Sequence, residues 1–353
     1  MNRWSNARVP LTLRNILLIR TDRIGDVMLS LPMLPLLKER FPDASITVMV
    51  QSYTRELVEG HSCVDDVLIY DAPESVGALI QQARALRRKK FDAVILPYPR
   101  FRLALLAFAA RIPVRIATGY RWYSFLFTHK IFEHRKDARH HELEYNLHLL
   151  SALGIDPAPD KATFELPGHA EAEETVTRFL EAHHIAADCP FAVIHPGSGG
   201  SARDWNVEHF AELGTRLQSN HGLNVIVTGG PQEGELVQQL CSLMHPMPVS
   251  CVGEFSLIEL AALFRRARVF VSNSTGPLHI AAAVGTPVAA FYPPIRQCSP
   301  ARWGPWTRKK VIFEGNNATC PLCKGGPCRS DVCMNQISVD TVEEGIMVLL
   351  REG

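Results

Sequence analysis

The stretch NILLIRTDRIGD, residues 15–26, decides the fold class of this chain. Its first six residues form a short apolar run that ends at Arg20, the pattern of a strand buried on both faces. Gly25 permits a tight turn after that strand, and residues 27–41 have helical spacing, with Pro32 and Pro35 expected to shorten or kink the first turn. A strand, a loop and a helix in immediate succession predict a parallel α/β sheet.

The same alternation runs through the rest of the chain, with one interruption. In the first half we expect strands at 45–50, 67–71, 91–97 and 114–118 and helices at 76–90 and 103–111. Residues 154–167 are rich in Pro, Asp and Gly and indicate a linker. Beyond it we expect strands at 191–195, 224–228, 269–272 and 287–292, helices at 207–218, 233–244, 256–266 and 277–284, and a final helix at 342–352. The sequence therefore predicts two doubly wound α/β domains, residues 1–166 and 167–353, with ligands bound beyond the carboxyl ends of their strands.

The composition of the 353 residues excludes several classes of protein. A hydrophobic fraction of 46% with 21% charged residues is typical of a folded protein rather than a disordered, collagenous or coiled-coil one. The longest weakly polar stretches, 103–114 and 280–294, are interrupted and are shorter than a membrane span requires. The first ten residues lack the apolar run of a secretory signal, so we expect a cytoplasmic protein.

Basic residues are concentrated in one part of a nearly neutral chain. Residues 84–141 contain 14 Lys and Arg but 3 Asp and Glu, which favours an anionic partner. For residues 84–90 alone, a solvated basic helix is an equally good interpretation. Nucleic acid is the weaker candidate, because we do not expect the aromatic residues to alternate with basic ones as single-strand binders require.

Three loops follow predicted strands and carry the chemistry. In the first, residues 21–26, Asp26 lies at the start of a helix, where a carboxylate is either a general base or an N-cap. The second, HPGSGG at 195–200, is rich enough in glycine for backbone N–H groups at Ser198 and Gly199 to bind an anion, with Arg203 close behind. It matches neither the P-loop nor the GxGxxG pattern, and a turn without a ligand is the alternative.

The third loop, SNSTGP at 272–277, joins a predicted buried strand to a helix. Ser274 or Thr275 is expected to cap that helix, and its N-terminus at Gly276 suits a phosphate. Two anion sites in one half indicate a diphosphate, and hence a nucleotide-linked donor. His279, one turn further, is either a ligand of that donor or a core histidine.

Four segments of the sequence, taken together and in order, resemble glycosyltransferase family 9, the lipopolysaccharide heptosyltransferases. They are ILLIRTDRIGDVMLSLPML, HPGSGGSARDWNVEHFAELG, VTGGPQEGEL and SNSTGPLHIAAAVGTPVAAFYPP. The resemblance implies a GT-B type fold, in which two Rossmann-like domains face a cleft. It also implies that the first domain binds the acceptor and the second a sugar nucleotide, usually ADP-heptose, with inverting transfer and no metal in the catalytic step.

The resemblance also assigns roles to individual residues. Asp26 falls on the catalytic base of the family, which takes the proton of the acceptor hydroxyl. Arg203 and the N–H groups near Thr275 would stabilise the departing diphosphate, and Glu233 falls where the nucleoside is held. The expected donor-binding residues are Ser198, Gly199, Arg203, Glu233, Ser274, Thr275, Gly276 and His279.

Two departures from the family pattern leave the donor open. The family usually has Lys at the position of Arg203, and Asp at the position of Ser274. Three alternatives therefore stand beside heptosyl transfer: a family 9 transferase that uses another sugar nucleotide, a sugar-nucleotide-binding protein without catalysis, and, last, a nucleotide-sugar epimerase.

The basic surplus would suit the anionic core of a lipopolysaccharide acceptor. The candidates are Arg100, Arg115, Arg121, Arg135 and His140. The same charges favour peripheral contact with the inner face of the cytoplasmic membrane.

Nine cysteines fall into two groups. Five are scattered, as expected of reduced thiols, whereas Cys320, Cys323, Cys328 and Cys333 are spaced C-x2-C-x4-C-x4-C. Four thiolates at that spacing could hold a structural metal, with reduced thiols or a disulfide as the alternative. We assign this cluster no part in catalysis.

Overall fold

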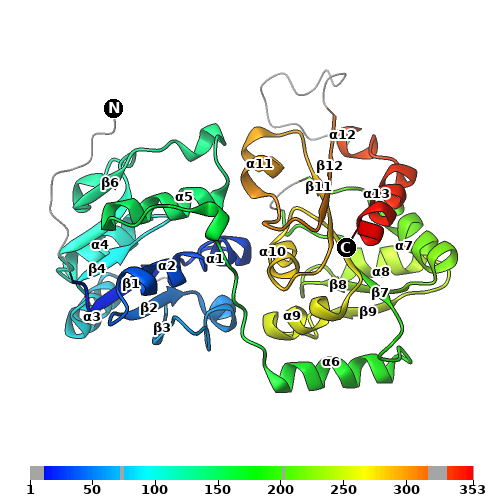
Figure 1. The fold of residues 1–353 in the computed structure, drawn as a ribbon, viewed down its shortest axis with the longest axis horizontal. Coiled ribbons are helices and arrows are strands. Elements are labelled where there is room, and N and C mark those ends of the chain that lie inside the picture. Colours follow the sequence, from blue (N-terminus) through cyan, green and yellow to red (C-terminus); the bar gives the residue numbers. More distant parts are fainter. Residues whose placement is uncertain (1–11, 72–74, 201–202, 317–331, 353) are drawn as a thin grey trace. The chain divides into compact units, whose positions relative to one another are not determined.

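The computed structural model describes residues 12–71, 75–200, 203–316 and 332–352. The chain divides into two compact units, Met1–Pro167 and Gly168–Gly353, which we call unit 1 and unit 2. Each unit contains a six-stranded sheet in which every strand pair is parallel (Figure 1). The predicted fold class, two doubly wound Rossmann-like α/β domains, is confirmed.

In unit 1 the strand order is β3-β2-β1-β4-β5-β6. The strands are β1 (Asn15–Ile19), β2 (Ser45–Val50), β3 (Asp66–Ile69), β4 (Ala93–Ile95), β5 (Val114–Thr118) and β6 (His129–Ile131). The helices are α1 (Ile24–Met28), α2 (Met33–Arg40), α3 (Val76–Lys89), α4 (Phe101–Ala109) and α5 (Glu142–His148), with short 3₁₀ turns between them.

The helix predicted at 27–41 is in fact two helices. Because Pro32 has no N–H to continue a helical ladder, α1 ends at Met28, and α2 begins immediately after the proline. β6 and α5 were not predicted: β6 has three residues at the sheet edge, and α5 begins in a stretch dense in His and charged residues.

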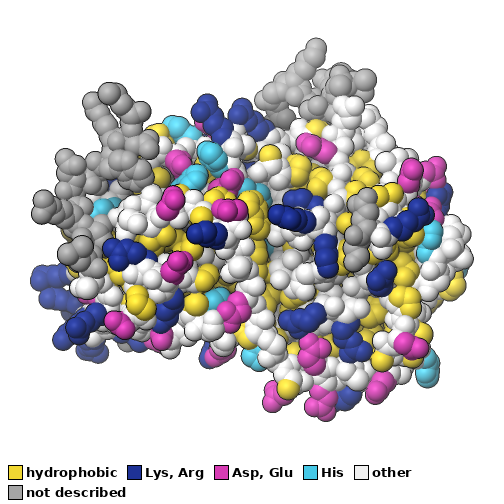
Figure 2. Space-filling view, in the orientation of Figure 1, with side chains coloured by type: hydrophobic (Ala, Val, Ile, Leu, Met, Phe, Trp, Pro, Cys, Tyr) yellow, Lys and Arg dark blue, Asp and Glu magenta, His cyan; other side chains and the backbone are white. Residues whose placement is uncertain are grey.

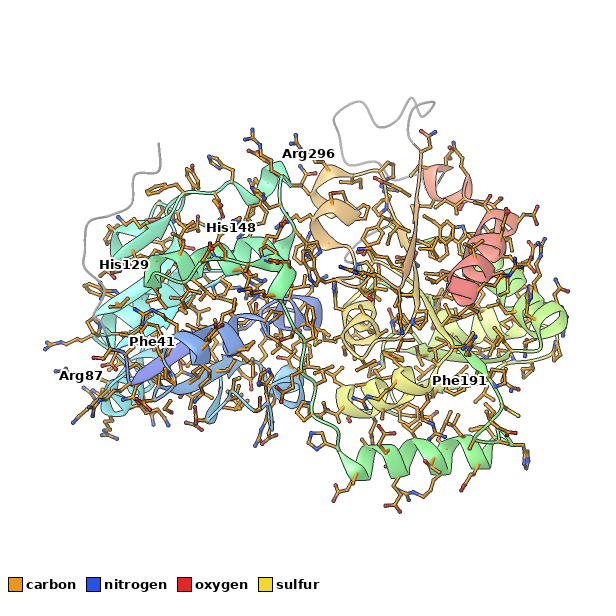
Figure 3. All side chains as sticks on the ribbon, viewed as in Figure 1. Phe41, Arg87, His129, His148, Phe191 and Arg296 are labelled. Atoms are coloured by element: carbon orange, nitrogen blue, oxygen red, sulfur yellow. The ribbon has the colours of Figure 1, made fainter. Side chains whose placement is uncertain are left out.

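In unit 2 the strand order, β12-β11-β10-β7-β8-β9, repeats the topology of unit 1. The strands are β7 (Phe191–His195), β8 (Asn224–Gly229), β9 (Val249–Val252), β10 (Val269–Asn273), β11 (Val288–Tyr292) and β12 (Lys310–Glu314). The helices are α6 (Ala170–Ala182), α7 (Val207–His221), α8 (Gly234–Leu243), α9 (Leu257–Arg266), α10 (Gly276–Ala283), α11 (Pro300–Trp303), α12 (Val332–Asn335) and α13 (Val339–Glu352). Figure 3 labels Phe191, where the central strand of this sheet begins.

The core of unit 2 is built around Trp205. Its indole stacks on Phe291 with ring centroids 4.2 Å apart, and its Nε1–H donates to the carbonyl of Ile337 at 3.0 Å. This bond fixes the segment between α12 and α13 to the core. At the other end of α12 the backbone of Gly315 lies against Cys333, so closely that a Cβ on the glycine would be 2.8 Å from the cysteine carbonyl oxygen.

Candidate functional site

Each sheet has a point at which the direction of strand addition reverses, and ligands of open α/β sheets bind beside it, beyond the carboxyl ends of the strands. In unit 1 this point lies between β1 and β4, and in unit 2 between β7 and β10. Arg20 directly follows β1, whereas His195 and Asn273 are the last residues of β7 and β10.

A buried arginine with three carboxylates forms the site of unit 1. Arg20 is 1% exposed; its Nε lies 3.4 Å from Asp22, and its Nη2 pairs with Asp26 and lies 3.6 Å from Glu142. Burial alone would lower the pKa of Arg20, but the three carboxylates raise it above its ordinary value. The guanidinium is therefore a permanent positive charge that holds three acidic side chains around it.

The three carboxylates differ in their access to solvent. The side chain of Asp26 is 20% exposed, against 9% for Asp22 and 2% for Glu142. Burial raises the pKa of Asp22, an effect that Arg20 opposes. Asp26 also accepts from the backbone N–H of Arg23 at 3.3 Å, as the N3 residue of α1. The N-cap of α1 is thus Arg23 and not, as one interpretation expected, Asp26; Asp26 accepts the capping-box bond from the third helical position and also presents its carboxylate to solvent.

α5 completes this cluster from a distant part of the sequence. Asn146 is fully buried; its amide donates to the carbonyl of Leu29 at 2.9 Å, and its oxygen accepts from Arg135 at 3.1 Å. Arg135 also pairs with Glu142. Sequence reasoning missed Glu142 and Asn146, for which the only local signal is their i, i+4 spacing on one helix face.

The candidate acceptor residues fall into two groups. Arg115 and Arg135 are half-buried, and they donate to internal acceptors: Arg115 to the carbonyls of Leu126 and Ile112, Arg135 to its α5 partners. Their guanidinium groups therefore support loops of unit 1. Exposed side chains form the second group, namely Arg100, Arg121 and His140. Arg100 also pairs with Asp22 at 3.3 Å, which joins it to the Arg20 cluster.

Part of the basic surplus lies at the amino ends of the strands of unit 1, away from Asp26. Exposed residues 87–90 form the end of α3, where positive charge complements the helix dipole (Figures 2 and 3; Arg87 is labelled). Asp92, just beyond, accepts from the backbone N–H groups of Arg14 and Asn15 at the amino end of β1. Asp26 follows the carboxyl end of β1, so these charges and Asp26 lie at opposite ends of the strands. The interpretation as a solvated helix end holds for them.

In unit 2 a histidine–glutamate pair connects two loops. The Nε2 of His195 lies 3.4 Å from Glu233, and its Nδ1 lies 3.0 Å from the hydroxyl of Thr228. Glu233 also accepts from the backbone N–H groups of Gly230 at 2.7 Å and Gly199 at 3.3 Å. The bond from His195 lowers the pKa of Glu233 most, and the backbone bonds add to it, so the pKa is about 2 despite partial burial. Glu233 is therefore an ionised carboxylate at the mouth of the glycine-rich loop.

Gly197 leaves the space that the Glu233 carboxyl group occupies. A Cβ at this position would overlap the Glu233 carboxyl group. Gly199 has a φ of +56°, which a residue with a side chain rarely adopts. The presence of glycine at these two positions is therefore explained by the structure of the loop itself, without a bound ligand.

Asn273, at the end of β10, ties the same loop to the core. Its amide donates to the carbonyl of Pro196 at 2.5 Å, and its oxygen accepts from the backbone N–H of Trp205 at 2.8 Å. The residue is fully buried, so both bonds are shielded from water. Sequence reasoning passed over Asn273 in favour of its neighbours.

The remaining donor candidates surround the start of α10. Thr275 is the N-cap residue by position, but its side chain makes no capping hydrogen bond, contrary to expectation. Ser274, the other expected cap, instead hydrogen-bonds through its side chain with Tyr292, whose pKa burial raises far above its usual value. Gly276 begins the helix, and His279 is buried.

Two other candidates lie near this loop. Ser198 is buried within the glycine-rich loop, and Arg203, half-buried, lies two residues before Trp205.

Three of the four clustered cysteines, Cys320, Cys323 and Cys328, lie outside the described residues. Cys333 is buried in the core of unit 2. In the described part of the chain no group of three His, Cys, Asp or Glu side chains is placed to hold a metal ion. Within the same residues, no helix has the length and apolar character needed to cross a bilayer.

Comparison with known proteins identifies the family. The profile of glycosyltransferase family 9 (heptosyltransferase) matches residues 79–333. The chain belongs to glycosyltransferase family 9. This family 9 chain is therefore a glycosyltransferase, as the sequence predicted.

Similar proteins span nearly the same length as this family 9 chain. Lipopolysaccharide heptosyltransferase 3 of Escherichia coli is 25% identical over 298 residues, covering 82% of this chain and 85% of that protein. A family 9 glycosyltransferase from Veillonella parvula superposes with a TM-score of 0.85 at 24% identity, covering 99% of this chain and 100% of that one. The ADP-heptose lipopolysaccharide heptosyltransferase II of E. coli superposes at 0.77 and 22% identity, covering 96% and 99%. The solved structures confirm the expected GT-B class of fold.

Proposed function

We propose that the protein transfers heptose from ADP-heptose, with inversion, to the core of a lipopolysaccharide. The observation that carries the proposal is the position of Asp26. It is the most exposed of three carboxylates around a buried arginine, at the switch point of a family 9 sheet. Similarity to heptosyltransferases of E. coli, one of which is named for ADP-heptose, supports the choice of donor.

In the proposed reaction Asp26 takes the proton from an acceptor hydroxyl while that oxygen forms a bond with the anomeric carbon. The bond from that carbon to the diphosphate oxygen breaks on the opposite face, and the electron pair leaves with ADP. The ion pair with Arg20 would hold the Asp26 carboxylate in a fixed orientation before the proton arrives. The products are the glycosylated acceptor, ADP and a proton on Asp26.

In unit 2 the proposed donor contacts come from both loops. The ionised Glu233 would accept hydrogen bonds from ribose hydroxyls. Arg203 and backbone N–H groups at Ser198, Gly199, Thr275 and Gly276 would stabilise the diphosphate, with Ser274 and His279 beside it. A structural metal on Cys320, Cys323, Cys328 and Cys333 stays a separate proposal, with no role in these steps.

One observation favours a different donor sugar. The family usually has an aspartate at the position of Ser274, and here the serine side chain forms a hydrogen bond with Tyr292. A serine cannot supply the negative charge that an aspartate presents to sugar hydroxyls. Transfer from another nucleotide sugar by the same residues is therefore the second candidate.

For the acceptor, Arg100, Arg121 and His140 are the proposed contacts to anionic groups, because their side chains are exposed. Arg115 and Arg135 would contribute by holding loops. We place the enzyme in the cytoplasm, in peripheral contact with the inner face of the membrane that carries its acceptor.

The test measures ADP release from ADP-heptose, and nucleotide release from a panel of other nucleotide sugars, with heptose-deficient lipopolysaccharide as acceptor. Asp26→Asn should lower kcat about 100- to 10,000-fold. Glu142→Gln is the matched control: it removes the same charge from the same arginine but at a side chain closed to solvent. Equal losses in the two variants would mean that Asp26 acts only through the cluster.

Three further outcomes separate the alternatives. Turnover of another nucleotide sugar, with none of ADP-heptose, would mean that the same mechanism operates with that other donor. Donor binding without turnover would favour a binding protein, and donor conversion without acceptor would favour an epimerase.

A further inference from the structure

Residues 93–132 combine an absence of carboxylates with a concentration of exposed aromatic side chains. These forty residues contain no Asp or Glu but six Arg and Lys. Among the described residues, eight Phe, Tyr and Trp side chains are exposed, and seven of them belong to this segment. They are Tyr98, Phe101, Phe108, Tyr120, Trp122, Phe125 and Phe132. Large exposed apolar side chains gathered in one place usually mark an interaction site.

The structure brings several of these side chains into contact. Phe101 stacks on Trp122 with ring centroids 4.9 Å apart, and the guanidinium of Arg121 lies 5.6 Å from the ring centroid of Tyr98. Trp122 is 74% exposed and Phe125 68%. We call Tyr98, Phe101, Arg102, Arg121, Trp122 and Phe125 the aromatic–arginine surface. Here aromatic and basic residues do alternate, at 98–102 and 120–122, so the expectation of no alternation was wrong.

This surface lies at the carboxyl ends of the strands of unit 1, as Asp26 does. Its residues come from the segments that follow β4 and β5, at the carboxyl ends of those strands (Figure 1, the cyan part of the chain). Arg100, between Tyr98 and Phe101 in the chain, reaches back to Asp22 in the Arg20 cluster. A partner held by the aromatic–arginine surface would therefore lie beside the carboxylate proposed as the base.

We propose that the aromatic–arginine surface docks on an anionic phospholipid bilayer. Aromatic side chains partition into the interface between lipid headgroups and acyl chains, while arginines reach lipid phosphates. The absence of carboxylates over forty residues removes the repulsion that an anionic membrane would otherwise impose. The inference deepens the proposed function and rests on it in one respect, namely that the acceptor is anchored in that bilayer.

The geometry favours a bilayer over the other polyanions. Trp122 and Phe125, three residues apart around the short 3₁₀ turn Ser124–Leu126, expose their rings widely, as side chains that insert into an interface must. Phe101 already covers one face of the Trp122 ring, so this ring offers a base of a single-stranded nucleic acid only its other face.

The experiment measures co-sedimentation of the whole protein with vesicles, in the absence of any nucleotide sugar. Wild type should bind vesicles containing phosphatidylglycerol and not vesicles of phosphatidylcholine alone, with affinity that falls as salt rises. Trp122→Ala/Phe125→Ala should weaken binding at least tenfold, and Arg121→Gln about fivefold. The matched control is Val76→Ala/Met247→Ala, which removes two equally exposed apolar side chains elsewhere and should leave binding unchanged.

Other outcomes would overturn the inference. Unchanged vesicle binding in a folded Trp122→Ala/Phe125→Ala variant would do so, as would no binding by wild type. Tight binding of an oligothymidylate that the double variant loses would reassign the surface to nucleic acid. A lower transfer rate to an acyl-free core saccharide, with vesicle binding intact, would reassign it to the sugar. Because vesicle binding is read without donor, failure of the proposed reaction leaves this test interpretable.

Discussion

Replacing Arg20 by Met tests the electrostatic interpretation of the unit 1 site. Removing one partner of a buried ion pair typically costs about 3–5 kcal/mol, because a charge is left without compensation. Here Asp22 retains Arg100 and Glu142 retains Arg135, whereas Asp26 retains only the backbone N–H of Arg23. We therefore expect a loss near the lower limit, about 3 kcal/mol.

For a unit of this size the loss corresponds to a fall in Tm of roughly 6–12 °C, measured by differential scanning calorimetry at neutral pH. Its pH dependence has a definite sign. Burial already raises the pKa of Asp22, and without Arg20 less opposes that effect, so the penalty is present at higher pH and diminishes as the pH falls through the raised pKa of Asp22. The difference from wild type should therefore shrink between about pH 8 and about pH 5.

The double variant Arg20→Met/Asp26→Asn is the control for this argument. Because it removes the carboxylate that has lost the most compensation, it should recover at least half of the lost stability. A difference in Tm that is the same at both pH values, or a double variant less stable than Arg20→Met, would refute the reasoning.

Three further predictions concern unit 2. Gly197→Ala should displace Glu233 and weaken ADP binding at least tenfold by isothermal titration calorimetry, with little change if the carboxylate is not part of the donor site. Glu233→Gln should lower the free energy of unfolding near pH 7, and this deficit should shrink as the pH falls from about 4.5 through about 2, since a carboxyl with a pKa of about 2 contributes fully above its unfolded pKa and loses that contribution as the pH falls through its folded pKa; a constant deficit would contradict this. Asn273→Ala leaves the buried Trp205 N–H and Pro196 carbonyl without their partner, and should cost roughly 2–4 kcal/mol in urea denaturation.

Much of the fold followed from the sequence because buried parallel strands are continuous apolar runs. β1, β7 and β11 lie within a residue or so of their predicted bounds, since each has a continuous apolar run of at least four residues and is followed by a loop. β6, β9 and β12, at sheet edges, carry mixed patterns and were missed. An edge strand has a neighbouring strand on one side only and is less completely buried, so its sequence need not be a continuous apolar run.

The candidate sites were predictable only in part. Asp26 and Glu233 stand beside glycines in loops after strands, where a local pattern can mark them. Glu142 and Asn146 meet Arg20 across more than 120 residues, and His195 meets Glu233 across 38. No local pattern encodes such pairs, because the strand order that creates them is a property of the whole sheet.

The contact between Gly315 and Cys333 has a consequence for the segment that contains the other clustered cysteines. Because Gly315 lies against Cys333, the two points that this segment joins lie together in unit 2. The entropy of closing a loop grows slowly with its length, about 0.6 kcal/mol for each doubling. A change in the number of residues between these two points should therefore cost unit 2 little stability, so the length of this part of the sequence is free of the constraint that the core imposes.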